Sequence, residues 1–84
     1  MTGPAPRPCT AYFSATRERP DRAAIDMAWI LRTADDPEHE HVQADGRIRR
    51  WRRVPEAGDR WLRVVLLADG ITIHNAFFDR SFAP

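Results

Sequence analysis

The stretch from Asp45 to Phe78 decides the fold, and it reads DGRIRRWRRV (45–54), PEAGD (55–59), RWLRVVLLA (60–68), DG (69–70) and ITIHNAFF (71–78). Two Asp-Gly pairs, Asp45-Gly46 and Asp69-Gly70, separate runs that are rich in β-branched and aromatic residues. Such pairs are the strongest short-range hairpin signal, because both central residues of a type I′ turn need a positive φ. The stretch therefore predicts an antiparallel β-meander with tight turns at both pairs.

The predicted strands run over residues 41–44, 47–54, 60–68 and 71–79, and the loop Pro55–Asp59 joins the second to the third. A two-residue loop at Asp69-Gly70 would fix the last register. It would set Leu66 opposite Ile73, Val64 opposite Asn75, and Leu62 opposite Phe77. Side chains alternate between the faces of a strand, so these residues share one face, which we expect to pack on a helix.

The opposite face of the predicted sheet is rich in arginine and aromatic residues. Seven arginines and two acids lie between Gly46 and Arg63. This face is expected to carry Trp61, Arg63, Val65 and Leu67, paired with Phe78, Ala76, His74 and Thr72. The five-residue loop adds Arg49, Trp51 and Arg53, whereas a slip of one residue would substitute Arg50 and Arg52. Arginines interleaved with tryptophan are typical of a surface for a polyanion, and RNA is the obvious one.

Upstream of the meander, the sequence predicts a short edge strand and two helices. The strand is expected at Thr10–Phe13, and Ser14 would cap a brief helix that Pro20 interrupts. A longer helix follows, because apolar residues share a stripe at helical spacing: Ala23, Ala24, Met27, Ile30, Leu31 and Ala34. Asp21 or Asp26 would cap this helix, and Asp36-Pro37 would end it. The expected fold class is α+β, an antiparallel meander of three to four strands with one or two N-terminal helices packed on one face.

Length and composition bound the domain organisation. With 84 residues the chain has room for one core, so residues 10–84 are expected to form a single α+β domain. Residues 1–9, which include three prolines, are expected to form a disordered tail rather than a signal peptide. Cys9 is the only cysteine, which excludes an intramolecular disulfide and a thiolate zinc site. These features predict a protein of the reducing cytoplasm with no membrane partner.

Charge is distributed unevenly along the chain, although its net value is only +1. Residues 35–45 hold five acids and no basic residue, and the arginine-rich strand follows directly. This distribution suggests an acidic edge beside a basic face, although acidic loops also serve solubility. All 13 basic residues are arginine, which is the better residue for bidentate phosphate contacts. A coding bias towards high GC content explains the absence of lysine most simply.

The arginine-rich face contains the residue types that metal-independent RNA cleavage needs: a base, an acid and cations that hold the phosphate. His74 is the candidate base or acid, and Arg63 and Arg80 are the other candidate catalytic residues. The candidate RNA-binding residues are Arg49, Trp51, Arg53 and Trp61, with the tryptophans stacking on unpaired bases. Alternatively, His74 is a half-buried packing residue, and the arginines are solvated or bind an acidic protein partner.

Trp29 and the Glu38–His41 segment allow two readings each. Trp29 lies roughly opposite the apolar helical stripe, so it either packs on the preceding segment or forms a partner contact, such as a homodimer interface. His39 and His41 would share one side of a strand, but two histidines without a third fixed ligand make a weak metal site. The sequence therefore predicts no metal and no cofactor.

Several different short motifs follow one another along the chain in a distinctive order. Arg17-Glu18-Arg19, Arg22, Ile25-Asp26 and a helix ending at Pro37 come first; Gly46-Arg47, Leu62-Arg63-Val64-Val65, a hairpin and a final strand follow. Over residues 12–80 this order resembles a small bacterial family of toxin-like domains similar to BrnT and, more remotely, to the RelE/ParE toxin superfamily. The resemblance implies a β-α-α-β-β-β order with helices on one face of an antiparallel sheet.

The resemblance also implies action on free or ribosome-associated RNA and a cognate antitoxin as partner. Many members of the family carry a histidine just before Arg-Glu-Arg, where this chain has Ala15-Thr16, so His74 would have to replace it. The leading prediction is a toxin-like RNA-binding protein that acts as a metal-independent RNA endonuclease. The alternative is a non-catalytic module whose arginine-rich face docks an acidic protein segment.

Overall fold

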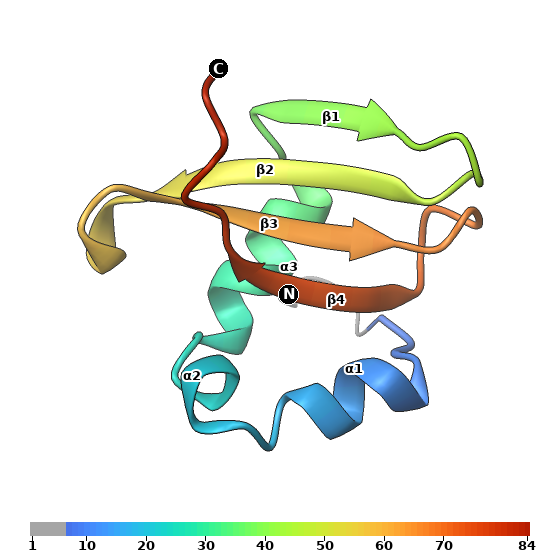
Figure 1. Cartoon of the computed structure of the whole chain (residues 1–84), viewed down its shortest axis with the longest axis horizontal. Coiled ribbons are helices and arrows are strands. Elements are labelled where there is room, and N and C mark those ends of the chain that lie inside the picture. Colours follow the sequence, from blue (N-terminus) through green and yellow to red (C-terminus); the bar gives the residue numbers. More distant parts are fainter. Residues whose placement is uncertain (1–6) are drawn as a thin grey trace, which may run out of the picture.

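The computed structural model describes residues 7–84. Within this range three α-helices precede a four-stranded antiparallel sheet with the order β1-β2-β3-β4 (Figure 1). The helices are α1 (Ala11–Thr16), α2 (Pro20–Ala23) and α3 (Met27–Asp35). The strands are β1 (His39–Val42), β2 (Ile48–Val54), β3 (Arg60–Leu66) and β4 (Ile73–Phe78), and a 3-10 turn, Pro55–Ala57, joins β2 to β3. The α+β class and the antiparallel meander are therefore confirmed.

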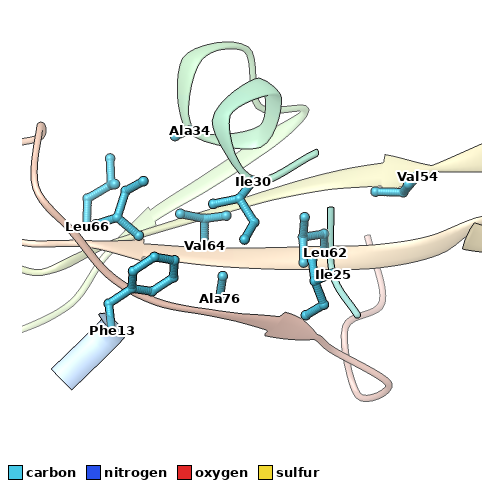
Figure 2. Packing of buried hydrophobic residues seen from close by; sticks show 10 residues of the cluster. Phe13, Ile25, Ile30, Ala34, Val54, Leu62, Val64, Leu66 and Ala76 are labelled. Atoms are coloured by element: carbon cyan, nitrogen blue, oxygen red, sulfur yellow. The ribbon is translucent and has the colours of Figure 1, made fainter. Parts of the chain in front are cut away.

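The core lies between the helices and one face of the sheet (Figure 2). Ile30 and Ala34 of α3 are fully buried, and Phe13 of α1 and Ile25 complete the helical side. The strands supply the other side from alternate positions: Val54, Leu62, Val64, Leu66, Ile73 and Ala76. Full burial of one such aliphatic side chain stabilises the fold by about 1.5–3 kcal/mol. No described helix covers the opposite face of the sheet, which we call the outer face (Figure 1).

Both Asp-Gly pairs lie in turns, but the turn type differs from the prediction. Gly46 and Gly70 have φ values of +93° and +70°, whereas Asp59 is the one non-glycine residue between 7 and 84 with a positive φ. The aspartates at 45 and 69 are therefore not the first left-handed residue of a type I′ turn. Their carboxylates instead accept the backbone N–H two residues ahead, at 3.0 and 2.8 Å, which favours a turn followed by one left-handed glycine.

The register between β3 and β4 also differs, because β4 contains a bulge. Leu66 pairs with Ile73 as predicted, but Val64 pairs with Ala76 rather than Asn75. The shift lies between the partners of Val65 and Leu66, where His74 is the extra residue of β4. The bulge turns Ala76 towards the core in place of the polar Asn75, which satisfies burial better than the regular ladder would.

The predicted edge strand at Thr10–Phe13 is wrong. Thr10 is the N-cap of α1, and its hydroxyl accepts the N–H of Phe13 at 3.1 Å, so the chain turns into a helix there. Only Cys9 forms a bridge, to Ile73, in parallel. Between residues 7 and 84, the order is therefore α-α-α-β-β-β-β rather than β-α-α-β-β-β. Ser14 lies inside α1 and does not cap a helix.

The longer predicted helix is divided into α2 and α3. Asp26 caps α3 by accepting the N–H of Ala28 at 2.9 Å, so the chain is not helical across residues 24–26. Arg17 stabilises the break, because its guanidinium donates to the carbonyls of Arg22 and Ile25 at 2.6 and 2.7 Å. The end of α3 at Asp35, before Asp36-Pro37, matches the prediction.

The two edge strands of the sheet, β4 and β1, differ in how far other parts of the chain cover them. On β4, Ile73 donates to Pro8 and accepts from Thr10, and Arg22 donates to the carbonyl of Ala76. All four residues of β1, at the other edge, are exposed. The contacts of Pro8 mean that the predicted tail is attached from at least residue 7, where Arg7 binds the carboxylate of Asp35 at 2.7 Å. Residues 1–6 of that predicted tail lie outside the described residues.

Candidate functional site

The arginines of β2 lie alternately on the two faces of the sheet. On the helical side, Arg50 binds Glu40 at 2.7 Å and Arg52 binds the carbonyl and carboxylate of Asp36. The acidic run at residues 35–40 thus neutralises the arginines on this side. Arg49, Trp51 and Arg53 lie on the outer face, as the register with β3 requires. The alternative slip that placed Arg50 and Arg52 there is excluded.

One half of the outer face contains a hollow of about 380 Å³, which we call the arginine pocket. Strands β2, β3 and β4 form its floor, and α1 and the β1–β2 turn form its sides. Its lining residues are Tyr12, Gln43, Arg47, Arg49, Arg63, Val65, His74, Asn75 and Phe77. The lining combines three arginines with hydrogen-bonding side chains and contains no carboxylate, which suits an anionic ligand.

Arg63 is the most constrained cation of the arginine pocket. Its guanidinium lies over the ring of Phe77, 4.5 Å from the centroid, and its Nε lies 3.7 Å from the carboxylate of Asp79. That Nε is buried and has no hydrogen-bond partner. Burial lowers the pKa of Arg63, and Arg49 lowers it further, whereas Asp79 opposes the shift. A bound anion would therefore relieve an electrostatic cost that Asp79 offsets only in part.

Arg49 and Arg47 complete the cationic side of the pocket. The side chain of Gln43 holds Arg49 through a hydrogen bond of 2.8 Å from Nε. Arg49 takes part in none of the ion pairs found among residues 7–84, and Arg47 has only a loose one, 3.7 Å from Asp45. Arg49 is therefore positioned by a neutral partner, and no carboxylate of residues 7–84 is paired with it.

His74 lies in the same pocket as Arg63, as the sequence predicted. The bulge in β4 positions it, and its Nδ1 lies 3.0 Å from the hydroxyl of Thr10. Its ring stacks on Tyr12, with centroids 5.0 Å apart. Tyr12 was not predicted as a site residue, because the strand predicted at Thr10–Phe13 did not place it beside His74. Their proximity depends on the packing of α1 against β4, which no local sequence signal reveals.

The other half of the outer face is an aromatic cluster formed by His39, Trp51, Trp61 and Phe82. Phe82 belongs to the segment after β4, which crosses the outer face towards β1 (Figure 1). Its ring stacks on Trp51 with centroids 4.6 Å apart, and Trp51 is only 7% exposed. The ring of Trp51 is therefore covered by Phe82 and has little access to solvent in this arrangement. Phe82 was not predicted as a site residue, because it follows the last strand and belongs to no recognisable sequence pattern.

Asp79 connects the two halves of the outer face. Its carboxylate accepts Nε1–H of Trp51 at 3.0 Å and both the N–H and the hydroxyl of Ser81. Burial alone would raise the pKa of Asp79, but these hydrogen bonds and the charge of Arg63 outweigh it and hold the pKa below its usual value. Asp79 is therefore a charged anchor for the segment that carries Phe82.

Two other candidate residues lie outside the arginine pocket. Arg53 is exposed, and its guanidinium lies over Trp61 at 5.2 Å. Arg80 is also exposed and borders a separate hollow beside Trp61 and Phe82. The structure therefore does not bring Arg80 together with His74.

The remaining candidates, Trp29, His39 and His41, also lie outside the arginine pocket. Trp29 is half-buried on the helical side, where its ring meets Phe78 at 6.4 Å. His39 and His41 share the outer side of β1, opposite Trp51 and Arg49. In the part of the chain that the structure describes, no group of three or more His, Cys, Asp or Glu side chains is arranged to hold a metal ion.

Comparisons of the chain with protein-family models, with curated proteins and with solved structures found no match. Within residues 7–84, no helix has the length and hydropathy that a membrane crossing requires.

Proposed function

We propose that the outer face binds RNA and that the arginine pocket holds a phosphate of its backbone. The observation that carries this proposal is the environment of Arg63, a half-buried arginine whose buried Nε has no hydrogen-bond partner. Arg49 and Arg47 line the same hollow. Arginine donates in a planar fork that matches two phosphate oxygens, so the three arginines that line the hollow are suited to hold one phosphate together.

The distribution of ion pairs supports a polyanion as the ligand. Acids neutralise the arginines of the helical side, whereas Arg49 and Arg53 of the outer face take part in none of the ion pairs that the described residues form. A net charge of +1 therefore conceals a local excess of positive charge on one face. Release of counterions from the nucleic-acid backbone would drive binding to such a face.

A second function, cleavage of the bound RNA, is favoured by the position of His74. In the tautomer whose Nδ1 donates to Thr10, Nε2 keeps its lone pair and can take the proton of a 2′-hydroxyl. The 2′ oxygen would then attack phosphorus, and the bond to the 5′ oxygen would break as that oxygen takes a proton from water. Arg63 and Arg49 would stabilise the charge on the phosphoryl oxygens. Such a reaction would make the chain a metal-independent ribonuclease, and the sequence resemblance implies the role of a toxin with a cognate antitoxin.

The test compares Arg49→Ala with Arg52→Ala, which removes an arginine from the helical side of the same strand. Binding of single-stranded RNA should fall for Arg49→Ala and change little for Arg52→Ala. In a plot of log affinity against log salt concentration, Arg49→Ala should also reduce the slope by about 0.7, the value for one phosphate contact of a single strand.

Two results would contradict RNA binding. One is an equal loss of RNA affinity in Arg49→Ala and Arg52→Ala, because it would show that the arginine pocket contributes no more to RNA binding than the helical side does. The other is binding of an acidic peptide, but of no RNA, by the unaltered protein. That second result would establish the alternative, a module that docks an acidic protein segment through Arg49 and Arg53.

A further inference from the structure

We propose that the aromatic cluster of the outer face is a slot for an unpaired nucleobase, and that Phe82 occupies the slot when no RNA is bound. The inference rests on the proposed RNA-binding function. It adds a base subsite beside the arginine pocket, which recognises only backbone phosphate. Displacement of Phe82 would then be part of RNA binding.

Phe82 lies in the slot as a stacked base would lie. Its ring is inclined by only 17° to the ring of Trp51, at a centroid distance of 4.6 Å. Trp61 and His39 meet it from the sides, at 66° and 58° and at centroid distances of 5.1 and 5.3 Å. One stacking surface, one edge-on ring and one tilted ring thus surround a planar ring in the slot. Stacking of this kind tolerates every base, because each base has a π-face.

The slot does not need Phe82 for its shape. The indole N–H of Trp51 donates to the carboxylate of Asp79 at 3.0 Å, and the side chain of Asp79 is only 7% exposed. Trp51 and Trp61 lie on adjacent paired strands, β2 and β3, and His39 pairs directly with Trp51 in β1. The sheet and Asp79 therefore fix the walls independently of the ring that fills the slot.

The attachment of Phe82 is weak compared with that of the residues just before it. Asp79 holds Ser81 through two hydrogen bonds, of 3.0 and 2.7 Å. Beyond Ser81, none of the hydrogen bonds found among residues 7–84 involves residues 82–84. Phe82 is thus held by ring contacts alone, and it can leave without breaking a backbone hydrogen bond.

The slot and the arginine pocket share a border. Arg63 lines the pocket, pairs with Trp51 in the ladder, and has its guanidinium 5.9 Å from the centroid of the Trp51 ring. Directly paired side chains begin about 5 Å apart, so a stacked base and an adjacent backbone phosphate can reach the two sites together. Arg53, over the ring of Trp61, adds positive charge on the other side of the slot.

The probe is adenosine, which carries a base but no phosphate, and the readout is the set of indole N–H signals of the three tryptophans in an NMR spectrum. In Phe82→Ala, adenosine should shift the signals of Trp51 and Trp61 at a concentration about fivefold or more below that needed for the unaltered protein. Trp29 lies on the helical side and should not respond. Phe82→Leu keeps an apolar cover over Trp51, so it serves as a second variant with an intermediate response if Phe82→Ala is unstable.

The outcomes separate the slot from the pocket. Arg49→Ala should leave adenosine binding to Phe82→Ala unchanged while it weakens RNA binding. Equal responses of the unaltered protein and a folded Phe82 variant, or no response at Trp51 and Trp61, would overturn the slot. If RNA binding then still depended on Arg49, the proposed function would stand. Adenosine binding in the slot together with no RNA binding by any form of the chain would support the slot and overturn the proposed function.

Discussion

Asp79 joins three parts of the outer face through one carboxylate. It accepts from Trp51 and Ser81 and lies 3.7 Å from Nε of Arg63. Its substitution by asparagine removes the charge and replaces one acceptor oxygen by a donor, which cannot accept the same hydrogen bonds. The result would be a less firmly held Trp51 and an Arg63 without the carboxylate that lies beside it.

Asp79→Asn should therefore lower the free energy of unfolding at pH 7 by about 1–3 kcal/mol. The folded-state pKa of Asp79 is lowered, so its contribution is present above the unfolded-state value, near 3.9, and is lost as the pH falls through the lower folded-state value. Urea unfolding of both proteins at pH 7, 5 and 3 measures this difference. A difference between the two proteins that is as large at pH 3 as at pH 7 would contradict the role of the charge.

The turns of the sheet are elements in which one glycine conformation decides the geometry. Gly46 has a φ of +93°, and a Cβ added there would lie 3.2 Å from Cβ of Ala68. Gly58 has a similar φ of +77°, but an added Cβ would meet nothing within 4 Å. Substitution at Gly58 therefore tests backbone strain alone, whereas substitution at Gly46 adds a steric conflict with Ala68.

Gly58→Ala should lower the free energy of unfolding by about 1 kcal/mol, because alanine is strained at positive φ. Gly46→Ala should lower it by more, since the neighbouring turn must also move. Chemical denaturation of the two variants at one temperature gives the comparison. Equal losses would mean that the close approach of Gly46 to Ala68 carries no energetic weight.

Elements with a strong local signal were predictable from the sequence, and elements that depend on distant contacts were not. Asp-Gly pairs and alternating side chains predicted β2, β3 and β4, and Asp36-Pro37 predicted the end of α3. The break before α3 depends on Arg17, whose guanidinium binds carbonyls five and eight residues ahead. No periodicity reveals such a contact.

The same distinction applies to the candidate site. Arg49, Arg63 and His74 were assigned to the outer face because strand alternation places them there. The bulge at His74 was not predictable, since it depends on which of Asn75 and Ala76 the core accepts. Burial of Trp51 beneath Phe82 requires the segment after β4 to cross the sheet, and that crossing depends on the hydrogen bonds of Asp79.

At the scale of the whole molecule, the ribonuclease proposal predicts an effect on living cells. Induction of the chain in a heterologous bacterium should arrest growth, and His74→Gln should abolish the arrest. In vitro, His74→Gln should slow RNA cleavage by about 10²-fold or more in the presence of EDTA, because glutamine cannot move a proton. RNA affinity and thermal stability should stay nearly unchanged. Reduced stability with undiminished activity would identify His74 as a packing residue instead.

The unequal edges of the sheet limit how copies of the chain can associate through their backbones. Pro8, Thr10 and Arg22 already satisfy groups along β4, whereas β1 presents its unpaired edge to solvent. Exposed strand edges are the usual templates for fibrous aggregation, which needs two free edges on every copy. Here a second copy could pair with β1, whereas Pro8, Thr10 and Arg22 already occupy part of the β4 edge. Edge-to-edge association is therefore favoured at β1 and opposed at β4, which disfavours growth into a filament.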